Sequence, residues 1–284
     1  MTAPSTLPLL HFTHGNSYPS GVYGRLLEAL GRDYDVRVTD MLGHDPRFPV
    51  DDSWRSLVDE LIARLEQHGR PAILVGHSLG GAVSTLAAWR RPDLARCVVM
   101  LDSPVVGGWR AQVWRLAKAL GLGPRLSPGA IAERRRDTWP SRAAAYEHFI
   151  AKPMFQAWAP GALDDYLDHG LAAACDGHVG GVRLRFRREV EAAVYASLPH
   201  GMGALLRRPF PVPVGFIAGT RSNELRQADL AATRRLVGDN FTTIEGTHLY
   251  PMEHPALTAQ LTRAMIERLL AGQGAPAGHG AIVA

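Results

Sequence analysis

The chain has 284 residues and a formal net charge of +4, so it is long enough for one large α/β domain or two smaller ones. No apolar run reaches the roughly 18 residues that a membrane-spanning helix needs. The start of the chain also lacks the basic stretch and the small-residue cleavage site of a secretion signal. We therefore expect a soluble, cytoplasmic protein with no membrane partner.

The first half of the chain alternates short apolar strands with helices. Strands are predicted in LPLLHFTHGN (7–16) and at 35–39, 72–75 and 97–101, with helices at about 21–30, 51–69 and 79–90. The strand at 72–75 is apolar without alternation, as expected of a central parallel strand that is covered on both faces. In the helix at 51–69, Asp51, Asp52 or Ser53 can cap the start and Gly69 the end.

From residue 103 to about 207 the pattern changes to helical segments separated by loops rich in Pro and Gly. No buried strand stands out there, so we expect a helical cap, or lid, inserted into a core of residues 1–102 and 208–271. The Trp and Phe residues of the cap either form an apolar acyl pocket or pack within the lid itself.

After the cap, the alternation of strands and helices resumes. Strands are predicted at 212–218 and 241–246, and helices at about 226–237 and 255–270. The tail, 272–284, is poor in core residues and is expected to be disordered.

The charged residues and the cysteines exclude some classes of site. The densest basic cluster, at 134–136, is flanked by Glu133 and Asp137, which favours a solvated helix face over a phosphate-binding tract. We predict no nucleic-acid partner, although the cluster could attract an anionic substrate. Cys97 and Cys175 lack the spacing of a metal site, so we predict neither zinc nor a disulfide.

The stretch GHSLG, Gly76 to Gly80, matches the G-x-S-x-G nucleophile elbow. In this motif, small residues on both sides let a sharp turn from strand to helix present a serine hydroxyl. The predicted strand and helix flank the match as the motif requires, which favours it over an ordinary glycine-rich turn. Ser78 is the candidate nucleophile, and the amide of Leu79, at a helix N-terminus, can face a developing oxyanion.

Four motifs together resemble the α/β-hydrolase superfamily, over nearly all of residues 8–271. They are HGN after the first strand, D-x-x-G-H (Asp40 to His44) after the second, the elbow, and GTHLYPMEHP after the last strand. The resemblance implies a mostly parallel sheet with helices on both faces and a site at the carboxyl ends of the strands. The N-terminus is too short for the first two of the standard eight strands, so we expect six strands and a helical cap.

A serine hydroxyl needs an imidazole to take its proton. His248 lies in the loop between the last strand and the last helix, which is where the superfamily places its catalytic histidine. His77 is expected to pack beside the turn and His14 to shape the oxyanion loop. By resemblance, the backbone N–H of Asn16 in that loop is the second oxyanion donor.

The acid that should orient the histidine is missing from its usual position. The superfamily commonly places an Asp in the loop after the penultimate strand, and Ser222 stands there in this chain. Two replacements are available: Asp102, at the end of the strand at 97–101, and Glu224, two residues beyond Ser222. Some members draw the acid from the first of these positions. We favour Asp102 because it needs no loop rearrangement, with Glu224 as the alternative. Otherwise Asp102 is a strand-end carboxylate that binds nearby amides.

These residues predict a serine hydrolase that cleaves a small to medium carboxylic ester or lactone through an acyl-enzyme, without cofactor or metal. A C–C bond hydrolase or lyase, or an acyltransferase, would use the same Ser78 and His248. A non-catalytic member that binds a small hydrophobic ligand is the alternative from another class. Dehalogenase chemistry is not expected, because Ser78 and Leu79 replace the Asp and Trp of those enzymes. The oligomeric state stays open.

Overall fold

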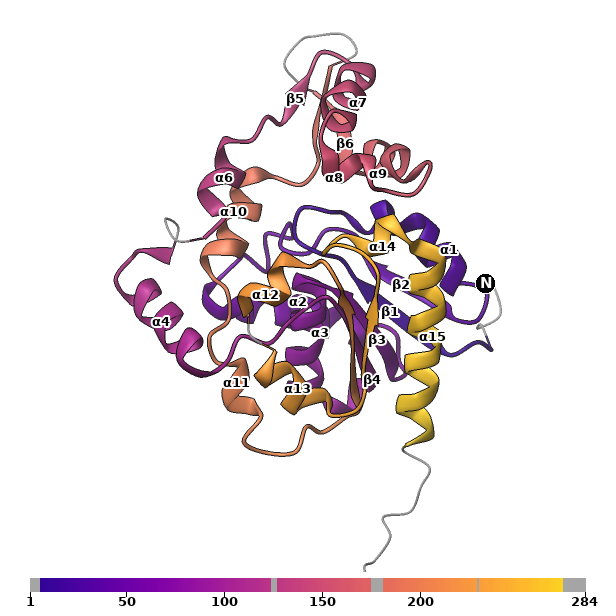
Figure 1. Cartoon of the computed structure of the whole chain (residues 1–284), viewed down its shortest axis with the longest axis vertical. Coiled ribbons are helices and arrows are strands. Elements are labelled where there is room, and N and C mark those ends of the chain that lie inside the picture. The colour runs from indigo at the N-terminus through magenta and orange to yellow at the C-terminus, as the bar shows by residue number, and fades with distance from the viewer. Residues whose placement is uncertain (1–5, 124–126, 175–180, 229, 273–284) are drawn as a thin grey trace, which may run out of the picture.

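The computed structural model of the protein describes residues 6–123, 127–174, 181–228 and 230–272. Within these residues, six parallel strands form one sheet in the order β2-β1-β3-β4-β8-β9 (Figure 1). The strands are β1 (Leu9–Thr13), β2 (Asp35–Thr39), β3 (Ala72–His77), β4 (Ala95–Leu101), β8 (Val214–Gly219) and β9 (Phe241–Ile244). The predicted α/β-hydrolase architecture with a six-stranded sheet is confirmed.

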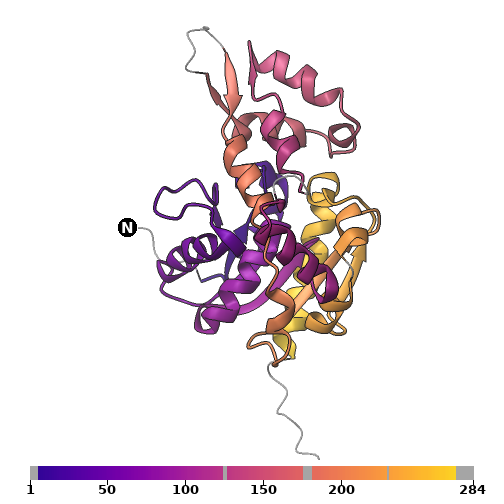
Figure 2. The same ribbon diagram turned by 90° about the vertical axis from the view of Figure 1, so that its left-hand side faces the viewer.

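Helices cover both faces of the sheet, as Figures 1 and 2 show. On one face lie α1 (Gly24–Leu30) and α15 (Pro255–Ala271). On the other lie α2 (Arg55–Glu66), α3 (Leu79–Arg90) and α13 (Ala231–Val237). No helix in the described part of the chain is both long enough and apolar enough to cross a membrane.

Strand β4 shows why the central strands lack an alternating pattern. Cys97, Val99 and Leu101 belong to the core beneath α1 and α15. Val98 and Met100 point the other way, into the core beneath α2 and α3. Because successive side chains alternate between two buried faces, both sets must be apolar.

Short helices complete the core, and one of them corrects a prediction. They are η1 (Ser20–Tyr23), η2 (Asp52–Trp54), η3 (Pro92–Leu94), α12 (Asn223–Ala228) and α14 (Tyr250–Glu253). The single helix predicted at 226–237 was wrong, because α12 and α13 are separate. The Ser222 hydroxyl accepts a hydrogen bond from the Leu225 N–H at 3.3 Å, which caps α12 three residues before the predicted start.

Part of the segment predicted as a helical cap, with the helices at 129–170 and 188–196, lies above the sheet in Figures 1 and 2, whereas its helices at 108–119 and 202–205 lie beside the sheet in Figure 1. Its helices are α4 (Gly108–Ala119), α6 (Gly129–Arg134), α7 (Arg142–Ile150), α8 (Pro153–Gln156), α9 (Ala162–Gly170), α10 (Arg188–Ala196) and α11 (Met202–Leu205). It also contains a small antiparallel sheet that the sequence pattern does not show, formed by β5 (Thr138–Trp139), β7 (Val182–Leu184) and β6 (Leu171–Ala173). Strands of two or three residues are too short to show a period of two.

Aromatic side chains of the cap segment pack mainly against one another. The rings of Phe149 and Phe155 are 5.0 Å apart between centroids, and those of Phe155 and Trp158 are 4.6 Å apart. Trp158 also reaches the core at Tyr18, with centroids 6.0 Å apart. These rings form the interior of the cap and join it to the loop after β1.

Two predictions concern residues whose structure is not described. Cys175 and residues 273–284 of the predicted disordered tail lie outside the described ranges. Cys97, by contrast, is buried as a free thiol in β4.

Candidate active site

Ser78 occupies a sharp turn between β3 and α3. Its backbone has φ 50° and ψ −117°, a left-handed conformation that a non-glycine residue adopts at a cost of about 1–3 kcal/mol. The turn is held by a hydrogen bond of 2.9 Å from the Ser78 N–H to the carbonyl oxygen of Leu101. The side chain is therefore presented at the carboxyl edge of the sheet, where it is partly exposed.

Two glycines make this turn possible, because neighbouring backbone lies where their side chains would be. A Cβ on Gly76 would lie 2.3 Å from the carbonyl carbon of Gly80. A Cβ on Gly80 would lie 2.0 Å from the carbonyl oxygen of Thr13. The elbow motif thus has a steric basis, and α3 starts in direct contact with the loop after β1.

His248 and Asp102 meet from different loops. The Nδ1 atom of His248 is 2.7 Å from Oδ2 of Asp102. His248 also lies beside the elbow, because its ring centroid is 4.7 Å from that of His77. The structure therefore brings the predicted base to a carboxylate at the end of β4 and next to the residue that precedes Ser78.

The Asp102 carboxylate is fully buried and has a donor for each oxygen. The Gly219 N–H donates to Oδ1 at 2.8 Å, and the Ser222 hydroxyl donates to Oδ2 at 2.5 Å. Hydrogen bonds of this kind stabilise the charged form of a carboxylate. Ser222 stands at the position where the superfamily commonly has its acid. Its hydroxyl instead binds Asp102, the carboxylate at the end of the neighbouring strand β4.

Glu224 lies further from the histidine than Asp102 does. Its Oε2 is 3.8 Å from Nδ1 of His248, and its side chain is 48% exposed, whereas that of Asp102 is 0% exposed. A distance of 3.8 Å is beyond a hydrogen bond, so Glu224 acts on the imidazole only through its charge. The geometry favours Asp102 as the partner of His248.

The charges around His248 change its affinity for a proton. Burial lowers the pKa of the imidazole, but the hydrogen bond to Asp102 and the charges of Glu224 and Asp102 outweigh this, so the pKa is raised. Since Nδ1 faces the carboxylate, it carries the ring proton in the neutral form. The lone pair of Nε2 is then free to accept a proton.

The loop after β1 is shaped by His14, as expected. His14 Nδ1 donates to the carbonyl oxygen of Gly15 at 2.8 Å, and Nε2 accepts from the Leu42 N–H at 2.7 Å. In this loop and at the elbow, the structure shows no protein acceptor for the N–H groups of Asn16 and Leu79 within the described residues. Both predicted oxyanion donors are therefore available to a ligand.

Asp102, Glu224 and His248 are also a possible set of metal ligands, because one atom from each lies within 4.8 Å of the others. However, both Asp102 oxygens already accept from the protein, and Oδ2 faces the Nδ1 that would have to bind the ion. The arrangement fits a histidine oriented by a carboxylate better than an ion site.

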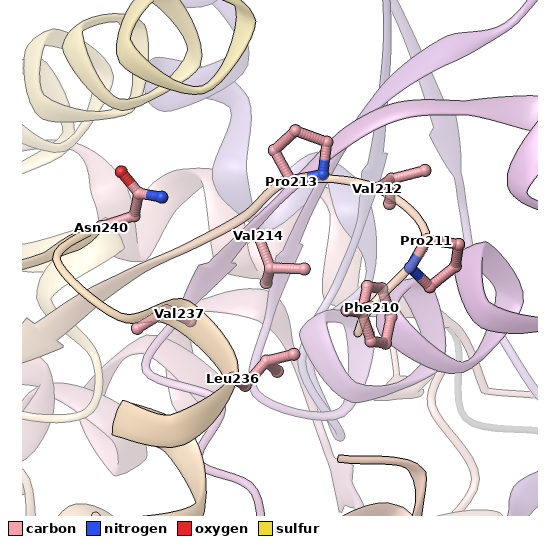
Figure 3. A pocket seen from close by; sticks show the side chains of 8 residues that line it. All are labelled: Phe210, Pro211, Val212, Pro213, Val214, Leu236, Val237 and Asn240. Atoms are coloured by element: carbon pink, nitrogen blue, oxygen red, sulfur yellow. The ribbon is translucent and has the colours of Figure 1, made fainter. Parts of the chain in front are cut away.

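A shallow hollow elsewhere on the surface is not part of this edge. It lies at the amino end of β8 (Figure 3), whereas Ser78 follows the carboxyl end of β3. Its lining residues are Phe210, Pro211, Val212, Pro213, Val214, Leu236, Val237 and Asn240.

Comparison with known proteins identifies the family of the chain. Residues 12–261 match the model of the alpha/beta hydrolase family. The chain belongs to this family. This family member is 26% identical to the lipase LipV of Mycobacterium tuberculosis over 263 residues, which cover 89% of the chain and 91% of LipV. It is 30% identical to pimeloyl-acyl-carrier protein methyl ester esterase of Xanthomonas oryzae over 97 residues, which are 34% of the chain and 38% of that protein.

A solved structure supports the fold at lower identity. The crystal structure of E-2-(acetamidomethylene)succinate hydrolase matches this family member with a TM-score of 0.71 and 23% identity, over 93% of this chain and 92% of the other. At this identity the match supports the fold alone.

Sequence reasoning missed two contacts of the site. Ser222 was read as an empty acid position, although a hydroxyl there is a suitable donor to a carboxylate from the next strand. Tyr23 was not considered, but its hydroxyl lies 2.8 Å from Nδ1 of His77. No local pattern marks Tyr23, because its helix is distant from the elbow in the sequence.

Proposed function

We propose that the chain is a serine hydrolase that cleaves small to medium carboxylic esters or lactones through an acyl-enzyme. The observation that carries the proposal is the 2.7 Å contact between His248 Nδ1 and Asp102 Oδ2, beside a serine held in a left-handed turn. This contact leaves His248 Nε2 as the basic nitrogen. Ser, His and carboxylate are the groups that acyl transfer requires.

In the first step, His248 Nε2 takes the proton of the Ser78 hydroxyl as its oxygen attacks the substrate carbonyl. The N–H groups of Asn16 and Leu79 donate to the oxyanion that forms. Asp102 stabilises the resulting imidazolium, which then gives its proton to the leaving alkoxide. In the second step, His248 takes a proton from water as the water oxygen attacks the acyl-enzyme. The bond to Ser78 then breaks, the imidazolium returns its proton to the Ser78 oxygen, and the acid is released.

The relatives favour an ester over other substrates, because they include a lipase and a methyl ester esterase. A C–C hydrolase or lyase and an acyltransferase remain alternatives, since they would use the same groups. The alternative of a non-catalytic protein that binds a small ligand depended on the absence of an acid at position 222. The contact between Asp102 and His248 removes that support. Operation without metal or cofactor stays a prediction.

A serine-reactive phosphonate probe tests the proposal directly. Wild-type protein should be labelled, and Ser78→Ala should not. Ser84→Ala is the matched control, because Ser84 is a buried serine of α3 whose hydroxyl has no partner within the described residues. This control should be labelled like wild type. An unlabelled wild type, with its fold verified by circular dichroism, would overturn the proposal.

The substrate class needs a second measurement. A panel of p-nitrophenyl esters and lactones of graded length should give turnover in wild type. Ser78→Ala should reduce kcat by a factor on the order of 10⁶, as removal of a catalytic serine does in other triads. Labelling by the probe without turnover of any ester or lactone would point to one of the other reactions of this scaffold.

A further inference from the structure

A chain of buried hydrogen bonds runs behind the proposed catalytic residues. The Gly15 N–H donates to the Tyr23 hydroxyl at 3.0 Å, and this hydroxyl lies 2.8 Å from Nδ1 of His77. On the other side of the ring, Nε2 of His77 lies 2.9 Å from the backbone carbonyl oxygen of His248. The chain thus joins the loop after β1, the end of β3 and the loop after β9.

The two ends of this chain, with a neutral His77 between them, determine the direction of every bond. The His248 carbonyl can only accept, so Nε2 of His77 carries the proton. Nδ1 must then accept from the Tyr23 O–H, and the phenol oxygen in turn accepts from the Gly15 N–H. A neutral His77 satisfies all of these bonds at once.

The surroundings hold His77 in this neutral form. Its side chain is fully buried, and so is that of Tyr23. Burial, and then the nearby His248, lower the pKa of His77 well below its ordinary value. The fit is close, because a Cβ on Gly15 would lie 2.7 Å from Nδ1 of His77 and 3.0 Å from the Tyr23 hydroxyl.

The chain connects the segments whose relative positions matter for acyl transfer. Gly15 precedes the proposed oxyanion donor Asn16, and His77 precedes the proposed nucleophile Ser78. The third segment, the loop after β9, contains the proposed base His248, whose backbone carbonyl accepts from His77. A displacement of about 1 Å between such groups can reduce a rate about 10²-fold.

We propose that His77 is a positioning residue, which holds the backbone of His248 at a fixed distance from the elbow and is itself oriented by Tyr23. This inference rests on the proposed serine hydrolase function. His77 does not touch the reacting atoms in this scheme, and it acts only through the peptide carbonyl of His248.

Two substitutions of His77 separate its two hydrogen bonds. In His77→Asn, the side-chain amide can occupy the place of Nδ1 and accept from Tyr23, but it is too short to reach the His248 carbonyl. In His77→Gln, the amide nitrogen can occupy the place of Nε2 and donate to that carbonyl. We expect kcat for a p-nitrophenyl ester to fall about 10²-fold in His77→Asn with KM nearly unchanged. His77→Gln should recover most of the loss.

Tyr23→Phe tests the other end of the chain, with Tyr34→Phe as the matched control, because Tyr34 is also buried but has no place in the chain. Tyr23→Phe should lower kcat less than His77→Asn does. By NMR, it should also speed hydrogen exchange of the Gly15 amide, while His77→Asn should leave this amide protected. The exchange measurement does not depend on catalysis.

The outcomes are distinct. If the wild type is active and His77→Asn has the same kcat, the positioning role is overturned. The proposed function then stays intact. Equal losses of kcat in His77→Asn and His77→Gln, at unchanged thermal stability, would also overturn it, because the bond to His248 would not then be the cause. A wild type that turns over no ester or lactone would overturn the proposed function, and the positioning role with it.

Discussion

The hydrogen-bonded side chains around the proposed catalytic residues and the aromatic interior of the cap segment differ in how their polar atoms are satisfied. At the edge, Asp102, His14 and His77 are buried, and each has partners for its side-chain polar atoms. In the cap segment, the buried indole N–H groups of Trp139 and Trp158 have no acceptor within the described residues. At these positions the edge is specified by directional bonds, and the aromatic interior of the cap segment by apolar packing.

The outer face of α4 makes the same point. The large apolar side chains there are each more than half exposed: Trp109, Val113 and Leu116 of α4, and Leu120 directly after it. Directional bonds define positions to fractions of an ångström, as catalysis requires, whereas packing tolerates exchange of one apolar group for another.

The largest effect should come from the edge. Asp102→Asn should reduce kcat by a factor on the order of 10⁴, because the imidazole loses the carboxylate that orients it. Glu224→Gln is the control and should cost far less, since Glu224 is 3.8 Å from the ring. Steady-state kinetics on a p-nitrophenyl ester measures both. A larger loss in Glu224→Gln would make Glu224 the acid.

In the cap, the large effect should be on stability. Trp158→Ala removes a buried ring and should lower the free energy of unfolding by about 3–5 kcal/mol. Trp158→Phe should cost less, because it keeps most of the ring and breaks no hydrogen bond of the indole N–H. Urea unfolding gives both values. If Trp158→Phe is as damaging as Trp158→Ala, the indole N–H has an acceptor, and the contrast between cap and edge fails there.

Acid should weaken the core through its buried neutral histidines. Burial lowers the pKa of His11 to about 3, so the folded state stays neutral where the unfolded chain takes up a proton. The free energy of unfolding should therefore fall as the pH drops below the ordinary value of 6.5, by about 2 kcal/mol at pH 5 for this one group. Urea unfolding at pH 7 and pH 5 measures the loss.

His11→Gln is the matched variant for this prediction. It should show a smaller loss between the two pH values, whatever its stability at pH 7. The same pH dependence as wild type would mean that His11 titrates normally in the folded state.

The smallest effect concerns the pH profile of catalysis. Because His248 must be neutral to accept a proton and its pKa is raised, kcat/KM should increase with pH through a midpoint above 6.5. Glu224→Gln should move this midpoint to lower pH, because the charge of Glu224 favours the imidazolium. An unmoved midpoint would show that Glu224 does not act on the base even through its charge.

Much of the fold could be predicted because apolar runs and helical stripes are local. The strand at 35–39 and the helix starting at Leu79 agree with β2 and α3. The start of α12 at Asn223 was missed, because it depends on a cap at Ser222 whose hydroxyl accepts from the Leu225 N–H. The strands of the cap segment were missed, because each pairs with a distant partner and is too short for a pattern of its own.

By itself, the sequence determined the superfamily, the six-stranded sheet, and the candidate roles of Ser78 and His248, since each motif lies next to the strand or helix that presents it. Only the tertiary structure decided which carboxylate His248 faces. Asp102 and Glu224 were both possible, because their distances from the imidazole depend on how two parallel strands end side by side. The pairing of β4 with β8 brings Asp102 to the Gly219 N–H and the Ser222 hydroxyl, and these donors hold its carboxylate against the ring.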